Sequence, residues 1–330
     1  MPDVEGEPYR APSYRLVVDE TSFDFRELEP DQLTRLLDIF NDTLGEILRE
    51  RPVAAAEWWH EHACLDGCEL SEFLYVRGGP GDTVSPDVRR RTALLMDRCR
   101  TWDTDETADV PDTVHLAGQV RELAWTLGYA LRRTLDGRTM ACLVFPADNP
   151  VMSGWQPVSL PTGDIEAELY FLHTAYELTA FWRGLYERED VPEHLFPVLA
   201  ADAFPGLVLA DTLSFRKFDG TYRELRGWVA KVLAVLNDHF ADALERHAGL
   251  PGHVQAELGR FGIDLSPESP NTRAKEKVMR QRDVEHDGET YRCEWHAKQH
   301  PARNRVHFTL PEQRLGGCIL VGIFVDHLDT

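Results

Sequence analysis

Two adjoining segments near the C-terminus alternate polar and apolar residues, a pattern typical of strands in which successive side chains point to opposite faces. The polar positions are Arg292, Glu294, His296, Lys298 and His300 in the first segment, and Arg303, Arg305, His307 and Thr309 in the second. The intervening positions are mostly apolar. We therefore predict two antiparallel strands whose polar side chains share one sheet face.

The flanking residues predict a small α+β module over residues 262–330. A short basic helix is expected over 273–280, and Asp287-Gly288 is a strong signal for a tight hairpin turn. The apolar run 318–325 lacks polar alternation, which is typical of a strand buried on both faces. We therefore expect one short helix followed by a four-stranded antiparallel sheet.

Helical patterns dominate the rest of the chain, where apolar residues recur at three- and four-residue intervals. Helices are expected over residues 29–48, 85–99, 114–133, 164–188 and 219–247, and strands over 14–19 and 140–145. The predicted class is α+β, with a mainly helical N-terminal region that has few strands.

Three parts are expected along the chain. The first is an acidic α-rich subdomain with an N-terminal strand, over residues 1–112, which ends in a polar, acidic linker at 101–112. The second is a helical subdomain with long amphipathic helices, over 113–261. A joint rich in Pro and Ser then leads into the module over 262–330.

Composition places the protein among soluble globular chains. Its 330 residues, 43% of them hydrophobic, can bury a sizeable core. No apolar run approaches the roughly 18 residues that span a bilayer, and the N-terminus has no basic start or apolar segment typical of a signal peptide. Six cysteines make a poor disulfide framework in a chain of this length. These features predict a cytoplasmic protein without a membrane partner.

The formal net charge of −21 is concentrated in the first 250 residues. Residues 251–330 hold 11 Lys and Arg against 12 Asp and Glu, which leaves 24 against 44 for residues 1–250. Such an acidic body repels nucleic acid at long range, so contact with a polyanion is expected only at the C-terminal patch. The acidic helical region is expected to bind a protein partner, or to cover that patch until a partner removes it.

The polar face of the predicted sheet suits chemistry on phosphate groups. Cleavage of an RNA backbone needs a base for the attacking hydroxyl, an acid for the leaving oxygen and cations that stabilise the transition state. Histidine serves both proton-transfer roles near neutral pH, and arginine binds phosphate oxygens in pairs. The candidate catalytic residues are His296, Lys298, Arg305, His307 and His327, and the candidate phosphate-binding residues are Lys298, Arg303 and Arg305.

Two further expectations follow for this face. If the turn at residues 301–304 closes the hairpin symmetrically, Lys298 lies opposite His307. Neither a metal nor another cofactor is expected to be needed.

The order of these elements resembles the sheet of RelE/HigB/ParE-type toxins: a short basic helix, a strand with His296-x-Lys298, a strand with Arg305-x-His307-Phe308, and an apolar strand that ends near His327. The resemblance covers about residues 262–330. It implies a bacterial toxin or phage-defence effector whose C-terminal face binds RNA and cleaves it without a metal, as the ribonuclease members of that family do. It assigns phosphate binding to Lys298, Arg303 and Arg305 and acid–base chemistry to His296, His307 or His327. Two departures stand against it. Those toxins are small free-standing proteins, and ParE-like relatives on the same scaffold do not cleave RNA.

The same residues fit a second interpretation. An antiparallel sheet normally keeps one polar face in water, and alternating Arg, Glu, Lys and His describes such a face. The protein would then be a non-enzymatic adaptor or interaction subunit of a defence or nucleic-acid-processing complex, with the basic strands as its docking surface.

A second group of chemically active side chains lies in residues 60–68. His60, His62, Cys64 and Cys68 are the residue types that bind tetrahedral zinc. Their spacing differs from that of a usual zinc knuckle, and on a helix the side chains would diverge, so buried cysteines at a helix end are the favoured interpretation. Another set, Cys293, His296, His300 and His307, is disfavoured because strand alternation places Cys293 and His296 on opposite faces.

Overall fold

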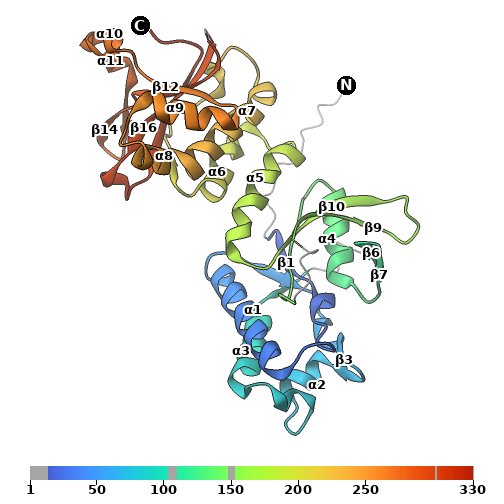
Figure 1. The fold of residues 1–330 in the computed structure, drawn as a ribbon. Coiled ribbons are helices and arrows are strands. Elements are labelled where there is room, and N and C mark those ends of the chain that lie inside the picture. The colour runs from blue at the N-terminus through green and yellow to red at the C-terminus, as the bar shows by residue number, and fades with distance from the viewer. Residues whose placement is uncertain (1–13, 103–109, 148–152, 302, 330) are drawn as a thin grey trace. The chain divides into compact units, whose positions relative to one another are not determined.

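The computed structural model describes residues 14–102, 110–147, 153–301 and 303–329. The chain forms two compact units, Met1–Phe181 (unit 1) and Trp182–Thr330 (unit 2) (Figure 1). Helices and strands occur in both units, which confirms the predicted α+β class. The expected boundaries after residues 112 and 261 fall inside unit 1 and unit 2, and most of the expected linker, 103–109, lies outside the described residues. No helix of the described residues is long and apolar enough to cross a bilayer.

Unit 1 is built on a mixed eight-stranded sheet with the order β5-β2-β1-β8-β10-β9-β6-β7. The first five strands are parallel, and β9, β6 and β7 continue the sheet through antiparallel pairs. The strands are β1 (Leu16–Val18), β2 (Val53–Ala55), β5 (Arg100–Thr101), β6 (Val114–Leu116), β7 (Gln119–Arg121), β8 (Ala141–Leu143), β9 (Gly154–Ser159) and β10 (Glu166–Leu172). The helices are α1 (Pro30–Glu50), α2 (Leu70–Tyr75), α3 (Pro86–Met96) and α4 (Trp125–Leu135), and β3 (Ala63–Leu65) and β4 (Cys68–Glu69) form a small separate ribbon. Helix α5 (Leu178–Arg188) begins in unit 1 and continues into unit 2.

More of unit 1 is extended than the residue patterns predict. The expected helices at 29–48 and 85–99 are confirmed as α1 and α3, each with a proline at its first position. Residues 166–172, expected in a long helix, form β10 instead. The second half of β10, Leu169–Leu172, is buried without interruption beside β8 and β9, so its apolar residues show no alternation. The helix expected at 114–133 is likewise wrong for 114–121, which form the β6–β7 hairpin.

Unit 2 contains a five-stranded sheet with the order β11-β17-β16-β15-β12. Strands β12, β15, β16 and β17 pair antiparallel, and β11 joins the edge parallel to β17. The strands of unit 2 are β11 (Leu207–Leu209), β12 (Asp264–Pro267), β13 (Asp283–His286), β14 (Glu289–Arg292), β15 (Trp295–His300), β16 (Arg303–Pro311) and β17 (Ile319–Val325). The helices are α6 (Phe196–Ala203), α7 (Tyr222–Val235), α8 (Ala241–Arg246), α9 (Pro251–Leu258), α10 (Pro270–Arg273) and α11 (Glu276–Met279), with a π-helical turn, Leu236–Phe240, between α7 and α8.

The four-stranded antiparallel arrangement exists, but its strand composition differs from the prediction. The turn at Asp287-Gly288 is confirmed, with positive φ angles of 49° and 78°, yet its strands β13 and β14 form a separate hairpin. Strand β12 takes their place beside β15. The sheet also extends beyond residues 262–330, because β11 pairs with β17 and Phe240 packs 5.2 Å from Trp295, measured between ring centroids. The predicted C-terminal module therefore shares its sheet and its core with earlier residues.

The β13–β14 hairpin packs closely against β17 at Gly322. A Cβ atom at this position would lie 2.5 Å from the Sγ of Cys293 and 2.8 Å from the Cγ2 of Val284. Both neighbours are buried, so they have little room to move away. Position 322 therefore requires glycine, because β17 and the β13–β14 hairpin approach each other too closely there for a side chain.

We predict that Gly322→Ala lowers the free energy of unfolding by about 1–3 kcal/mol, because the added methyl group overpacks a filled interior. Urea unfolding followed by fluorescence measures the change. Gly252→Ala in α9 is the matched control, because no atom lies within 4 Å of the added Cβ there. Equal stability of the two variants would contradict the packing argument.

Candidate functional site

The polar face of the unit 2 sheet brings together most of the predicted site residues. His296 on β15 pairs with His307 on β16, and Lys298 pairs with Arg305. The prediction that Lys298 lies opposite His307 was wrong, because β15 runs to His300 and β16 begins at Arg303, which leaves a shorter turn than expected. The register is therefore shifted by two residues, and the two histidines face each other with ring centroids 5.0 Å apart.

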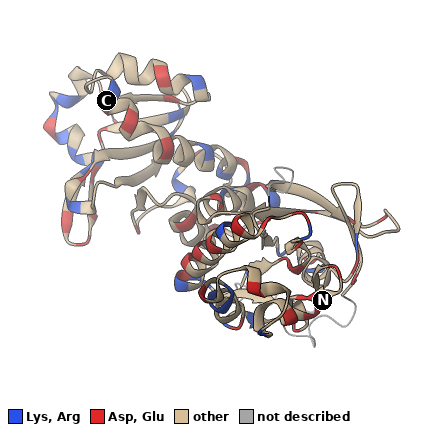
Figure 2. Ribbon diagram, turned by 60° about the horizontal axis from the view of Figure 1, so that its bottom comes forward, with Lys and Arg blue, Asp and Glu red and all other residues tan. Residues whose placement is uncertain are grey.

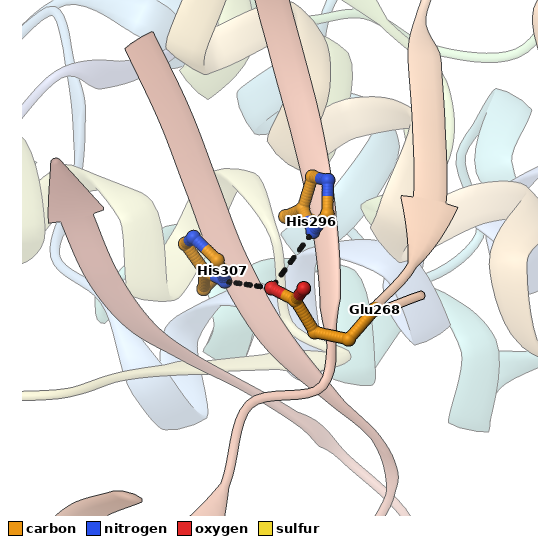
Figure 3. Close-up of side chains that lie close together, drawn as sticks. All are labelled: Glu268, His296 and His307. Atoms are coloured by element: carbon orange, nitrogen blue, oxygen red, sulfur yellow. Dashed lines mark ion pairs between the residues drawn. The ribbon is translucent and has the colours of Figure 1, made fainter. Parts of the chain in front are cut away.

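Glu268, which follows β12 directly, lies between the two histidines (Figure 3). Its Oε1 atom is 3.5 Å from the Nδ1 of His296 and 3.9 Å from the Nδ1 of His307. Arg282 donates a hydrogen bond from Nε to the same oxygen at 2.9 Å, and the side chains of this ion pair are only 1% and 4% exposed. Arg282 also donates to the carbonyl oxygens of Val278 and Asp329. One arginine thus connects the end of β12, α11 and the C-terminal segment.

Burial and charge set the protonation states of this cluster. Burial alone would raise the pKa of Glu268, but its interactions with His296 and Arg282 outweigh burial and lower the pKa to about 2. Burial lowers the pKa of His307 to about 3, and it also lowers the pKa of His296. Near neutral pH the cluster therefore holds one carboxylate, one guanidinium and two neutral imidazoles.

A pocket of about 230 Å³ opens beside the cluster. Its walls carry three cations and three hydroxyl groups around Glu268 and His296: Arg282, Lys298, Arg305, Ser266, Ser269 and Thr272. Three positive charges against one carboxylate give the lining a formal charge of about +2. Acidic and basic residues occur throughout both units (Figure 2), so this excess of positive charge is a local feature of the pocket.

The predicted site residues differ in accessibility. Lys298 is half-buried, His296 and Arg305 are 6% and 9% exposed, and all three line the pocket, whereas His307 is completely buried behind it. Arg303 lies outside the pocket and pairs with Asp219, and His327 is exposed and also outside it.

Five polar residues that line the pocket were not predicted from the sequence: Ser266, Glu268, Ser269, Thr272 and Arg282. Ser266, Glu268 and Ser269 lie in the stretch that the sequence predicts as a joint, and Arg282 ends a 3-10 turn (Arg280–Arg282) that follows the expected basic helix. The short apolar alternation Ile263, Leu265 before the prolines was the available sign of β12, because both residues are buried.

The proposed zinc ligands of residues 60–68 do not come together. This segment folds as a 3-10 turn at Trp59–Glu61 followed by β3 and β4, and not as a helix. Cys64 donates a weak hydrogen bond from Sγ to the carbonyl oxygen of Cys68 at 3.6 Å. Among the described residues, one group of three or more His, Cys, Asp or Glu side chains has its ligand atoms within 4.8 Å of one another: Glu268, His296 and His307.

Unit 1 has a separate buried polar cluster where β1 ends. In the parallel part of the sheet, β2 and β5 lie on one side of β1, and β8 and β10 lie on the other. The strand order therefore reverses between β1 and β8, and open α/β sheets commonly bind ligands at such a position. Asp19 and Glu20 follow β1, both are buried, and Glu20 accepts a hydrogen bond from the backbone N–H of Thr126 in α4. Burial, followed by the charge of Asp19, raises the pKa of Glu20 to about 8, so this carboxyl is largely protonated at neutral pH.

No protein-family model matches this chain, no curated protein matches its sequence, and no solved structure matches it. The resemblance of residues 262–330 to RelE/HigB/ParE-type toxins therefore stays a prediction.

We predict that Arg282→Met destabilises unit 2 by about 3–5 kcal/mol, because it leaves the buried carboxylate of Glu268 without its cation. The double variant Arg282→Met/Glu268→Met should recover much of this loss, since both charges are then absent. Arg280→Met is the matched control: it breaks an exposed pair with Glu276 and should cost at most about 1 kcal/mol. Urea unfolding measures all three, and a loss at Arg282 no larger than at Arg280 would refute a structural role for the pair.

Glu20 should make the protein less stable as the pH rises. The unfolded chain ionises this carboxyl above pH 4.5, whereas the folded chain keeps its proton up to about pH 8. Between these values the folded state is therefore expected to lose up to about 1.4 kcal/mol per pH unit. Glu20→Gln should remove this slope, so that the variant gains stability over the wild type at pH 8 but not at pH 5. Parallel stability curves for the two proteins between pH 5 and 8 would show that Glu20 ionises normally.

Proposed function

We propose that unit 2 binds a small ligand through a phosphate monoester group, in the pocket lined by Lys298 and Arg305. The observation that carries this proposal is that, among the described residues, the buried guanidinium group of Arg305 has an unused hydrogen-bond donor. Its side chain is buried, and its Nε atom has no hydrogen-bond partner among the described residues. Its Nη2 atom donates a hydrogen bond to the carbonyl oxygen of Pro301 at 3.3 Å. Among the described residues no carboxylate lies within ion-pair distance of this guanidinium, although Glu268 and Asp326 attract it from further away. A buried cation without a close counterion favours an anion from outside.

The charge of the pocket favours a dianion. A phosphate monoester carries about −1.5 to −2 at neutral pH, which matches the formal charge of about +2 on the lining. A phosphodiester carries a single negative charge and would leave one cation uncompensated. Hydroxyl groups also line the pocket: Ser266 lies 3.3 Å from His296 Nε2, and Ser269 and Thr272 share one hydrogen bond of 2.9 Å. An O–H group that these contacts leave free can donate to the remaining phosphate oxygens.

The size of the pocket supports a small group. A volume of about 230 Å³ is below the roughly 300–1,000 Å³ of pockets that enclose whole drug-sized ligands. A neighbouring hollow of about 550 Å³ shares Ser266 and Lys298 with it and is lined by residues of α9 and β12. The phosphate group would occupy the smaller pocket and the rest of the ligand the larger hollow.

Cleavage of an RNA backbone at this face, which the sequence suggested, finds less support. His307 has no exposed surface, so the imidazole cannot exchange a proton with a bound RNA directly. Arg303 and His327 lie outside the pocket. The observations therefore favour a phosphate end group over an internal phosphodiester.

We expect phenyl phosphate to bind the full-length protein at low ionic strength, as measured by isothermal titration calorimetry. Lys298→Ala and Arg305→Ala should each weaken binding roughly 10–100-fold, which corresponds to the loss of one charge-assisted hydrogen bond. Arg305→Lys should retain part of the affinity, because it keeps the charge and loses the paired donors. Arg303→Ala, in the same hairpin but outside the pocket, is the matched control and should bind within twofold of the wild type.

Two results would overturn the proposal. One is phosphate binding that is equally strong in the wild type and in the Lys298 and Arg305 variants. The other is tight binding of an RNA oligonucleotide without terminal phosphates, with no binding of phenyl phosphate, since the face would then recognise the RNA backbone.

A further inference from the structure

Beside the phosphate pocket lie three potential metal-ligand atoms that the proposed phosphate contacts do not use. They are the Nδ1 atoms of His296 and His307 and the Oε1 atom of Glu268 (Figure 3). We propose that these three residues bind a divalent transition-metal ion of the zinc type. The inference rests on the proposed function for the external anion that would complete the coordination, whereas the three protein ligands rest on their own geometry.

The distances between the ligand atoms suit a metal ion of this size. Ligands placed tetrahedrally at about 2.0–2.1 Å from zinc lie roughly 3.4 Å from one another. The Oε1 atom of Glu268 lies 3.5 Å from the Nδ1 of His296 and 3.9 Å from the Nδ1 of His307. These two distances exceed the tetrahedral value by only about 0.1 and 0.5 Å, and the ligand atoms of all three residues lie within 4.8 Å of one another.

Unsatisfied nitrogens give independent support. The Nδ1 of His296 and both ring nitrogens of His307 are buried and have no hydrogen-bond partner among the described residues. His296 is 6% exposed and His307 is 0% exposed, so solvent does not replace the missing partners. Buried polar atoms without partners are rare in folded proteins, and a metal ion coordinated by both Nδ1 atoms would give a partner to two of these three nitrogens.

The charge states also suit metal binding. Neutral imidazoles and an ionised carboxylate are the forms that coordinate metals, and the Arg282 guanidinium beside Glu268 favours the ionised carboxylate. Two imidazole nitrogens and one carboxylate are typical of zinc and ferrous iron, and they disfavour magnesium and calcium, which prefer oxygen ligands.

The surroundings of the three residues resemble those of an open metal site. The Nε2 of His296 is 3.3 Å from the Oγ of Ser266, which orients the ring with Nδ1 toward Glu268. Arg282, Lys298 and Arg305 surround the pocket beside it, so a dication here would need an anion at its free position. The phosphate group of the proposed ligand is an anion of that kind.

Metal binding is tested on the full-length protein after treatment with a chelator and its removal. Zn²⁺ titrated by calorimetry should bind with one equivalent at the cluster. Glu268→Gln and His307→Ala should each weaken that binding roughly 100-fold or more, since the loss of an outer-shell partner alone costs 10–100-fold. His60→Ala/His62→Ala is the matched control, because these histidines lie outside the cluster, and it should leave the affinity unchanged.

A spectroscopic measurement needs no variant and therefore does not depend on whether the altered proteins fold. Co²⁺ bound to the wild type should show the visible d–d bands of a nitrogen and oxygen site, without the near-ultraviolet charge-transfer band of a thiolate ligand. A thiolate band would assign the ion to cysteines such as Cys64 and Cys68. That result, or the absence of Co²⁺ and Zn²⁺ binding by the folded wild type, would overturn the inference.

The two proposals fail in different ways. Lys298→Ala should lose phenyl phosphate and keep Zn²⁺, whereas Glu268→Gln should lose Zn²⁺. If the wild type binds phenyl phosphate in the presence of a chelator but binds no metal, the metal inference is rejected and the proposed function remains. If the wild type binds metal but not phenyl phosphate, the proposed function is rejected and the metal inference remains.

Discussion

The candidate site depends on one buried ion pair, Glu268 with Arg282. Taking both charges out of water is costly, and the cost is recovered only where geometry is good and the remaining donors are satisfied. Arg282 meets that condition, because it also donates to two backbone carbonyl oxygens, at 3.0 and 2.8 Å. The pair fixes the end of β12 to the turn before β13 and to the C-terminal segment, and it positions the Glu268 carboxylate between the two histidines.

The histidine pair follows from sheet geometry around that carboxylate. The register of β15 and β16 places His296 and His307 side by side, and β12 adds Ser266 on the next strand. Aromatic packing covers the opposite face, where Phe240 contacts Trp295 and Phe308. Because that face is apolar and the ion pair covers the polar face, the histidines lose contact with water and stay neutral. Because His307 is buried, it cannot exchange protons with a bound substrate, whereas its neutral ring nitrogen suits the proposed role of metal ligand.

The sequence correctly predicted the elements whose conformation depends on residues close in the chain. It failed for elements and site residues whose role depends on contacts with distant residues. Helix α1 and the turn at Asp287-Gly288 follow from spacing and backbone preference. Strand β10 was missed because its buried half depends on β8 and β9 for its partners. The polar face of β15 and β16 was found, but its register depended on the length of one turn. Glu268 was missed because no periodic pattern surrounds it, and its role arises from contacts with Arg282, His296 and His307, between 14 and 39 residues away.

The charge of the whole chain and that of the pocket together restrict the ligand. A protein with a net charge of −21 repels an extended polyanion over much of its surface, and the attraction of a few exposed cations is screened within about 10 Å at moderate salt. Arg305 and Arg282 are buried, so their fields are screened less and act at short range within the pocket. A ligand that presents one concentrated dianion meets these charges together, whereas each internal phosphodiester of a long backbone presents a single negative charge to them. The proposed preference for a small phosphorylated molecule therefore depends on the local positive charge of the pocket, in a chain whose net charge of −21 opposes general binding of nucleic acid.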